Sequence, residues 1–194
     1  RNQTPPTIIC PALLVPCLTD SITPSYLKNV LKLTNAAPTA TDACGGNVIL
    51  TYLDNVTTGN CDSAFSQKII RRWMVRDANS NSTDCLQEIR VLHMTLNDLK
   101  IPADATVACP GATIGPDVTG RPSFFWNGVD LKKTNSCTLN AVQGKDSTIA
   151  LCGGSRRVRR TWEAVNLCGG GVTKFFQNID IQDTKAPVLT CPQH

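Results

Sequence analysis

Two stretches of this chain share one pattern: Ile69-Ile70-Arg71-Arg72-Trp73-Met74-Val75-Arg76-Asp77 and Val158-Arg159-Arg160-Thr161-Trp162-Glu163-Ala164-Val165-Asn166. Side chains two residues apart point to the same face of a β-strand. One face of each stretch therefore carries an apolar residue, an arginine, a tryptophan and a second apolar residue. We predict that each stretch is a strand whose tryptophan packs in a hydrophobic core.

The similarity extends on both sides of these stretches. The matching segments are, in chain order, Pro11–Cys17 with Pro102–Cys109, Pro24–Tyr26 with Pro122–Phe124, and Gln87–Val91 with Gln177–Ile181. The repeat period of roughly 90 residues is a usual size for a β-sandwich domain. The inward residues of the matching strands are the predicted core: Trp73, Trp162, Ile89, Val91, Ile179 and Ile181.

The repetition divides the chain into three parts. Residues 1–97 form the first repeat, and residues 98–183 form the second. Residues 184–194 resemble the beginning of the chain, because both places have a Pro four residues before a Cys-Pro pair. We interpret them as the start of a third repeat or as an assembly strand, and we expect the chain to be a fragment of a longer protein.

Composition favours an all-β fold. The 12 prolines and 13 glycines bound short apolar runs, as in domains with many turns. No run approaches the roughly 20 apolar residues of a membrane-spanning helix. The net charge of +4 does not indicate nucleic acid or membrane as a partner, and the basic cluster Arg156–Arg160 lacks interleaved aromatic residues.

Cysteine usage indicates an oxidising compartment. The chain has 10 cysteines but no CxxC pair, and His93 and His194 are its only histidines, so a zinc site is not expected. A disulfide framework in a secreted or cell-surface protein is the simpler interpretation.

No pattern in the sequence indicates catalysis. GxGxxG, P-loop, HExxH and GxSxG motifs are all missing. His93 ends a predicted strand with no recognisable nucleophile nearby, so we interpret it as a surface histidine. We predict that the chain is not an enzyme and needs no cofactor.

Three groups of residues could bind a ligand. Asp42 and Asp77 are a weak calcium candidate, since the matching residues of the second repeat are both asparagines. The aromatic run Phe124–Trp126 is either a stacking platform for glycans or part of the core. Arg71 and Arg160 either bind a ligand or stack on the tryptophan of their own strand, which is the simpler interpretation.

The repeated motifs resemble those of hyalin-repeat-like (HYR-like) domains. The resemblance is carried by Cys10-Pro11-Ala12, Asp42-Ala43-Cys44-Gly45, Arg71–Asp77 and Cys85–Val91, and in the second copy by Arg160–Ala164, Leu167-Cys168-Gly169 and Gln177-Asn178-Ile179. Such domains form tandem arrays in secreted and cell-surface proteins, including very large adhesins of gliding and filamentous Bacteroidetes-type bacteria. The resemblance implies two tandem immunoglobulin-like β-sandwich domains.

The two copies differ in one pair of cysteines. Cys10 aligns with Ile101 and Cys85 aligns with Phe175, so both cysteines are replaced together by apolar residues. In an immunoglobulin-like sandwich the first and last strands run parallel and start at the same end. We therefore predict a Cys10–Cys85 disulfide.

The other pairings are less constrained. Placing the turns on a sandwich favours Cys17–Cys61, Cys109–Cys152 and Cys137–Cys168. The alternative keeps Cys44–Cys61 and Cys137–Cys152 as local bonds, together with Cys109–Cys168. The first scheme leaves Cys44 and Cys191, for which we expect either an intersubunit disulfide from Cys191 to Cys44 (or Cys17) of the next subunit, or a bond of Cys191 within a third repeat and a buried Cys44 thiol.

The resemblance implies a structural function. We expect a repeat module of an extracellular adhesin or filament, with neighbouring copies or adjacent repeats as partners. The alternative is a secreted module that binds surface glycans or another ligand.

Overall fold

The chain has an all-β fold that divides into two units. The computed structural model describes residues 3–109, 111, 113–184, 186 and 188. Unit 1 comprises Arg1–Thr95, Trp126–Val129 and Ser136–Thr138, and unit 2 comprises the rest. The main boundary lies two residues before the expected one, and two short segments of the second sequence repeat belong to unit 1. Most of the expected third segment, residues 184–194, lies outside the described residues.

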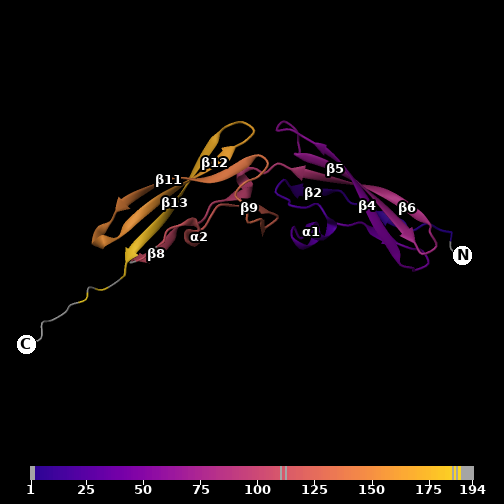
Figure 1. Cartoon of the computed structure of the whole chain (residues 1–194), viewed down its shortest axis with the longest axis horizontal. Coiled ribbons are helices and arrows are strands. Elements are labelled where there is room, and N and C mark those ends of the chain that lie inside the picture. The colour runs from indigo at the N-terminus through magenta and orange to yellow at the C-terminus, as the bar shows by residue number, and fades with distance from the viewer. Residues whose placement is uncertain (1–2, 110, 112, 185, 187, 189–194) are drawn as a thin grey trace, which may run out of the picture. The chain divides into compact units, whose positions relative to one another are not determined.

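The first repeat folds around one large sheet (Figure 1). Its elements are β1 (Thr7–Ile9), β2 (Leu13–Pro16), α1 (Pro24–Asn29), β3 (Thr39–Thr41), β4 (Val48–Thr58), β5 (Gln67–Asp77) and β6 (Ser82–Leu92). The strand order is β2-β6-β5-β4, and β1 pairs separately with β3. β2 runs parallel to β6, whereas the β6–β5 and β5–β4 pairs are antiparallel.

The second repeat builds the same sheet. Its elements are η1 (Leu96–Asp98), β7 (Leu99–Lys100), β8 (Ala105–Cys109), α2 (Pro116–Thr119), β9 (Ser123–Trp126), β10 (Val129–Asp130), β11 (Leu139–Ala150), η2 (Cys152–Gly154), β12 (Arg156–Asn166) and β13 (Val172–Asp183). The large sheet has the order β11-β12-β13-β8, with β8 parallel to β13, and a smaller sheet has the order β10-β9-β7.

The strand registers establish which positions are equivalent. Trp73 pairs across the sheet with Cys85, and Trp162 pairs with Phe175. The sequence alignment of Cys85 with Phe175 is therefore correct. The alignment of Cys10 with Ile101 is wrong by one residue, because Leu13 pairs with Ile89 and Ala105 with the equivalent Ile179, which makes Pro102 the equivalent of Cys10.

The two short helices correct one part of the alignment. Pro24 begins α1 seven residues after Cys17, and Pro116 begins α2 seven residues after Cys109. Proline is favoured at this first helical position, because its missing N–H would have no partner there anyway. The equivalent of Pro24 is thus Pro116. The expected match with Pro122–Phe124 is wrong, because that segment leads into β9.

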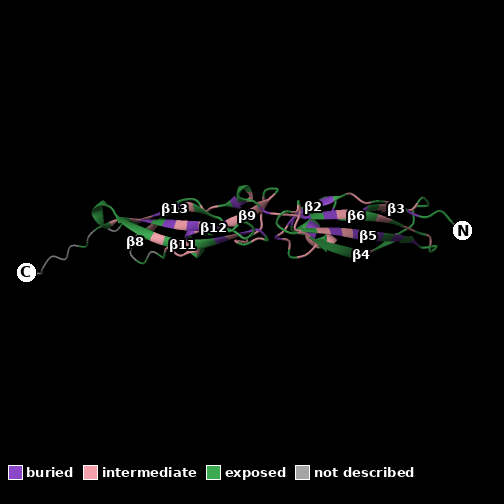
Figure 2. Cartoon of the chain, turned by 90° about the horizontal axis from the view of Figure 1, so that it is seen from above, coloured by how far each residue is buried: buried purple, intermediate pink, exposed green. Residues whose placement is uncertain are grey.

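The core lies on one face of each large sheet. The buried positions alternate along the central strands β5 and β12 (Figure 2). All the predicted core residues are buried: Trp73, Trp162, Ile89, Val91, Ile179 and Ile181. No helix among the described residues is both long enough and apolar enough to cross a membrane.

Candidate functional site: buried polar networks and disulfides

Arg71 is a fully buried cation in the middle of β5. Its cross-strand partner on β4 is Asp54, whose carboxylate accepts hydrogen bonds from Nε at 2.7 Å and from an Nη at 2.8 Å. The same Nη donates to the carbonyl of Ile22 at 2.7 Å, and the Tyr52 ring lies 4.2 Å from the guanidinium carbon. A two-point ion pair of this kind is among the stronger polar contacts in proteins. It joins the sheet to the segment that precedes α1.

Arg160 repeats this arrangement on β12. Its Nε and an Nη donate to Asp146 of β11 over 3.0–3.3 Å, and that Nη also donates to the carbonyl of Ile114 at 2.7 Å. The other Nη donates to the hydroxyl of Thr119 at 2.9 Å. Each guanidinium carbon lies 5.8 Å from its strand's indole ring, so the ion pair is closer than the expected stacking contact. Both arginines therefore hold their own domain together.

The tryptophan of β5 belongs to a second buried chain of hydrogen bonds. Its indole N–H donates to the side-chain carbonyl of Gln87 at 2.9 Å. The amide of Gln87 in turn donates to the backbone carbonyl of Pro11 at 3.0 Å, which places the segment after β1 over the inner face of the sheet. A buried indole N–H usually finds such a partner, because an unpaired one is costly.

The same chain of bonds exists in unit 2. Trp162 donates to Gln177 at 3.3 Å, and the Gln177 amide donates to the carbonyls of Ala103 at 2.8 Å and Thr119 at 2.6 Å. Gln177 is fully buried, as is its equivalent Gln87. The sequence showed the arginines and tryptophans but missed the partner carboxylates Asp54 and Asp146. The signal that could have found them is an aspartate on the preceding strand of each copy.

The two aspartates considered as calcium ligands instead accept hydrogen bonds from backbone N–H groups of their own turns. The buried carboxylate of Asp77 accepts hydrogen bonds from the backbone N–H groups of Asn79 and Asn81 and from the Asn81 side chain. Burial raises the pKa of Asp77, but these bonds and the nearby Arg76 outweigh it, so the pKa lies below its ordinary value of 3.8. Asp42 accepts from the N–H groups of two residues of its own turn. Among the described residues, no group of three or more potential metal ligands is found.

The Cys10–Cys85 disulfide predicted from the sequence is present in the structure. Its Cα atoms lie 6.1 Å apart, within the usual range for a disulfide. It joins the residue after β1 to β6, directly beside Trp73 in the register. The bond therefore fastens the smaller layer of unit 1 onto its large sheet.

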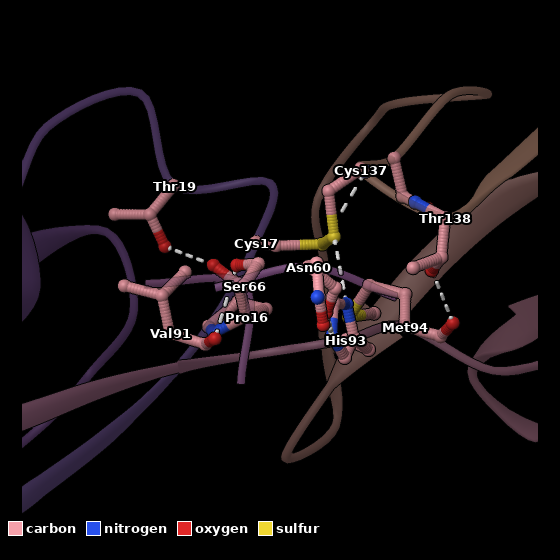
Figure 3. The surroundings of a disulfide bond; sticks show 11 residues. Pro16, Cys17, Thr19, Asn60, Ser66, Val91, His93, Met94, Cys137 and Thr138 are labelled. Atoms are coloured by element: carbon pink, nitrogen blue, oxygen red, sulfur yellow. Dashed lines mark hydrogen bonds between the residues drawn. A yellow bond between two sulfur atoms is a disulfide. The ribbon is translucent and has the colours of Figure 1, made fainter. Parts of the chain in front are cut away.

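A second disulfide joins Cys17 to Cys137, which are 120 residues apart in the sequence (Figure 3). Cys17 follows β2, whereas Cys137 precedes β11 and belongs with Ser136–Thr138 to unit 1. The neighbouring Thr138 hydroxyl donates to the carbonyl of Met94 at 2.7 Å, so this segment is held by a hydrogen bond as well. The bond links residues of the two sequence repeats.

His93 lies beside this disulfide. Its Nε2 donates to the carbonyl of Asn60 at 3.2 Å, and its Nδ1 lies 3.6 Å from the sulfur of Cys137 (Figure 3). His93 is partly buried rather than a plain surface residue, and its contacts are those of a packing residue.

The Cys17–Cys137 bond corrects the expected pairings. Neither Cys17–Cys61 nor Cys137–Cys168 can form once Cys17 and Cys137 are bonded to each other. The expected Cys109–Cys152 bond is also wrong, since both thiols are free. The alternative scheme fails too, because each of its pairs requires a bond at Cys44, Cys109 or Cys152, and Cys44 is free as well. Cys61 and Cys168 are disulfide-bonded.

Strand spacing explains why Cys109 and Cys152 are not bonded to each other. Cys109 ends β8, whereas Cys152 lies in the β11–β12 turn, so β13 separates them in the order β11-β12-β13-β8. Two strand spacings are about 10 Å, beyond the roughly 7 Å that a disulfide can bridge. The other two expected bonds fail for a different reason, because Cys17 and Cys137 are bonded to each other and neither is left for Cys61 or Cys168.

The free cysteines are the thiols that remain for contacts with other molecules. Among the described residues, Cys44 and Cys152 are exposed and free, and Cys109 is free and partly buried. The expected intersubunit bond between Cys44 and Cys191 stays a prediction, because Cys191 lies outside the described residues.

The aromatic run does not form an exposed platform. Phe124 is fully buried, and the ammonium of Lys100 lies 4.0 Å from the centre of the Phe125 ring. The indole N–H of Trp126 is buried and has no hydrogen-bond partner among the described residues. These rings are therefore largely part of the packing.

The basic cluster of β12 is divided between two faces. Arg160 is buried, whereas Arg157 forms a salt bridge with Asp180, and Arg159 lies 3.9 Å from the centre of the Phe176 ring. Hydrogen bonds from Arg157 lower the pKa of Asp180. The cluster thus makes contacts within its own sheet.

The comparisons with known proteins show no family for this chain. No protein-family model matches it, and a search of curated proteins finds no match. Among solved structures, the chain is similar to Drosophila N-cadherin EC1-4, with 10% identity and a TM-score of 0.32 over 94% of this chain and 50% of that one. It is similar to the extracellular cadherin domains 1–5 of protocadherin gamma B2, again with 10% identity and a TM-score of 0.32, over 97% of this chain and 41% of that one. The chain thus spans half or less of each, and likeness at this level assigns no function. The HYR-like resemblance stays a prediction.

Proposed function

We propose that this chain is a structural repeat module of an extracellular surface adhesin or filament, and that it assembles head-to-tail with neighbouring repeats or copies. The observation that carries the proposal is the Cys17–Cys137 disulfide, a covalent bond between residues of two successive sequence repeats. The bond fastens a segment of the second repeat to unit 1, so the repeats are joined by more than the chain that runs between them, which suits an array under mechanical load.

The interior of each unit supports the same function. The two buried arginines are each ion-paired with an aspartate of the same unit, so the charge of each is balanced within its own domain. The disulfides require an oxidising compartment, which supports a place outside the cytosol. A role without catalysis is part of the proposal.

Electron microscopy and light scattering of the oxidised, purified chain test this function. We expect elongated end-to-end assemblies whose mean length grows with protein concentration. A matched variant, Cys17→Ala/Cys137→Ala, keeps the Cys10–Cys85 bond and should lose resistance to unfolding under force. A chain that stays monomeric at every concentration and binds glycans on an array would contradict the proposal.

A further inference from the structure

Cys109 occupies in unit 2 the position that Cys17 occupies in unit 1. Cys17 follows Pro16, which pairs in parallel with Leu92 of β6. Cys109 follows Ala108, which pairs in parallel with Gln182 of β13. Leu92 and Gln182 are equivalent, because each lies seven residues after the strand partner of its domain's tryptophan. Yet Cys17 is bonded and Cys109 is free.

Cys44 occupies in unit 1 the position that Cys137 occupies in the second repeat. Val48 begins β4 opposite Asp77, and Leu139 begins β11 opposite the equivalent Asn166. Cys44 and Cys137 lie four and two residues before these strand starts. Cys137 is bonded to Cys17, whereas Cys44 is exposed and free. The described residues therefore contain one complete bond of this kind and the two unpaired halves of another.

The two halves lie at opposite ends of their sheets. β2 is parallel to β6, and two antiparallel steps lead from β6 to β4, so β2 and β4 run in the same direction. Cys44 lies where β4 begins, whereas the end of β2, and by equivalence the end of β8 with Cys109, is the opposite end. A bond from Cys44 of one copy to Cys109 of another joins two different surfaces, so it can be repeated from copy to copy and does not close as a two-fold pair.

We propose that Cys109 of one copy forms a disulfide with Cys44 of the next copy, which continues along the assembly the bond that Cys17 and Cys137 make within the chain. The inference rests on the proposed function and names its covalent link. It assigns the partner of Cys44 to Cys109, in place of the Cys191 expected from the sequence.

The local structure presents Cys44 for such a bond. The Asp42 carboxylate accepts hydrogen bonds from the N–H groups of Cys44 at 3.4 Å and Gly46 at 3.2 Å, and the Asp42 carbonyl accepts from Gly45 at 3.0 Å. Gly45 has a φ of +74°, a backbone conformation that glycine adopts without strain. The turn is thus fixed while its thiol stays exposed.

The chemistry is an ordinary thiol oxidation. The two thiols together lose two protons and two electrons as the sulfur–sulfur bond forms. An extracellular disulfide, such as oxidised glutathione, accepts them by thiol–disulfide exchange and leaves as two thiols.

Non-reducing electrophoresis of the full chain in a glutathione redox buffer tests the proposal. We expect a ladder of multimers that collapses to monomer with reductant, and a Cys44–Cys109 peptide by mass spectrometry. Cys44→Ser and Cys109→Ser should each reduce the multimers at least tenfold. The control variants Cys152→Ser and Cys191→Ser should keep the ladder.

A mixing experiment makes the test directional. Cys44→Ser retains only the Cys109 half, and Cys109→Ser retains only the Cys44 half, so each alone should stay monomeric while the mixture gives a dimer and nothing larger. Near-ultraviolet circular dichroism checks that both variants are folded, and Cys109→Ala replaces Cys109→Ser if the serine variant is not.

A ladder that needs Cys191 but not Cys109, an intrachain Cys109–Cys152 bond, or no multimer would overturn the inference. If light scattering still finds end-to-end assemblies in Cys44→Ser, the proposed function stands without this link.

Discussion

Units 1 and 2 each bury an arginine at the equivalent position, but the surroundings of the two arginines differ. In unit 1 the Tyr52 ring lies against the guanidinium of Arg71, and one Nη of Arg71 is buried without a hydrogen-bond partner among the described residues. In unit 2 the corresponding Nη of Arg160 donates to Thr119. The position of Thr119, ten residues after the cysteine that ends its strand, is occupied in unit 1 by Leu27. The aspartate is the contact that both units keep. A buried cation thus requires its counter-charge, whereas the rest of its surroundings can change.

A second difference concerns the strand partner of the tryptophan. Unit 1 has Cys85 there, bonded to Cys10, and unit 2 has the half-buried Phe175. A covalent bond and an apolar ring therefore occupy equivalent places in the two domains. Unit 1 depends on a crosslink where unit 2 depends on packing alone.

Removing the crosslink should produce the largest effect. We expect Cys10→Ala/Cys85→Ala to lower the free energy of unfolding of unit 1 by about 4–5 kcal/mol, because the bond closes a loop of 75 residues in the unfolded chain. Hydrogen-exchange mass spectrometry reads the two units separately, and unit 2 should be unchanged. The variant Cys10→Ile/Cys85→Phe, which places apolar side chains at both positions, should recover about 1–2 kcal/mol by packing. Equal losses in both units would show that they do not unfold independently.

Removing the aspartates should give the next largest effect. Asp54→Ala leaves the charge of Arg71 without a counter-charge, and we expect a loss of about 3 kcal/mol, since Asp54 is partly exposed. Asp146→Ala should cost less, because Arg160 keeps hydrogen bonds to Thr119 and Ile114. Urea unfolding of the two variants measures the difference. A larger loss for Asp146→Ala would contradict this account of the two sites.

The sequence could predict the fold because its strongest signal is local. The alternation around Trp73 and Trp162 depends only on neighbouring residues of one strand, and so does the burial of Ile89 and Ile179. The Cys10–Cys85 bond could also be predicted, because the second repeat lacks both cysteines together.

The other disulfides could not be predicted in this way. Pairing within each repeat is the simplest assumption. Cys137, however, lies in a short segment of the second sequence repeat that belongs to unit 1. That choice depends on contacts such as Thr138 with Met94, which are distant in the sequence. The ion pairs were missed for a related reason, since Asp54 and Arg71 are matched only once the register of β4 and β5 is known.

Removing the hydroxyl that only unit 2 uses should have a smaller effect. Thr119→Val leaves an N–H of the buried Arg160 unpaired, and we expect a loss of about 1–3 kcal/mol in unit 2. Thr119→Ser keeps the hydroxyl and should be nearly neutral, which separates the hydrogen bond from the packing of the methyl group. Chemical denaturation of the two variants side by side measures the difference. If serine and valine were equally destabilising, the hydroxyl would have no role.

The smallest expected effect is a dependence of stability on acid pH, which the turn after β5 should show and the turn after β12 should not. Asp77 and Asn166 are equivalent, and each side chain accepts backbone N–H groups of its own turn. The folded pKa of Asp77 lies below 3.8, so its contribution to stability is present above that pH and is lost as the pH falls through the folded pKa. Asp77→Asn should remove this acid dependence from unit 1, and Asn166→Asp should introduce it in unit 2. Thermal unfolding from pH 5 down to pH 2 measures both slopes, each compared with the wild-type chain so that the other carboxylates cancel. An unchanged slope in Asp77→Asn would mean that the turn is held by its backbone bonds and not by the charge.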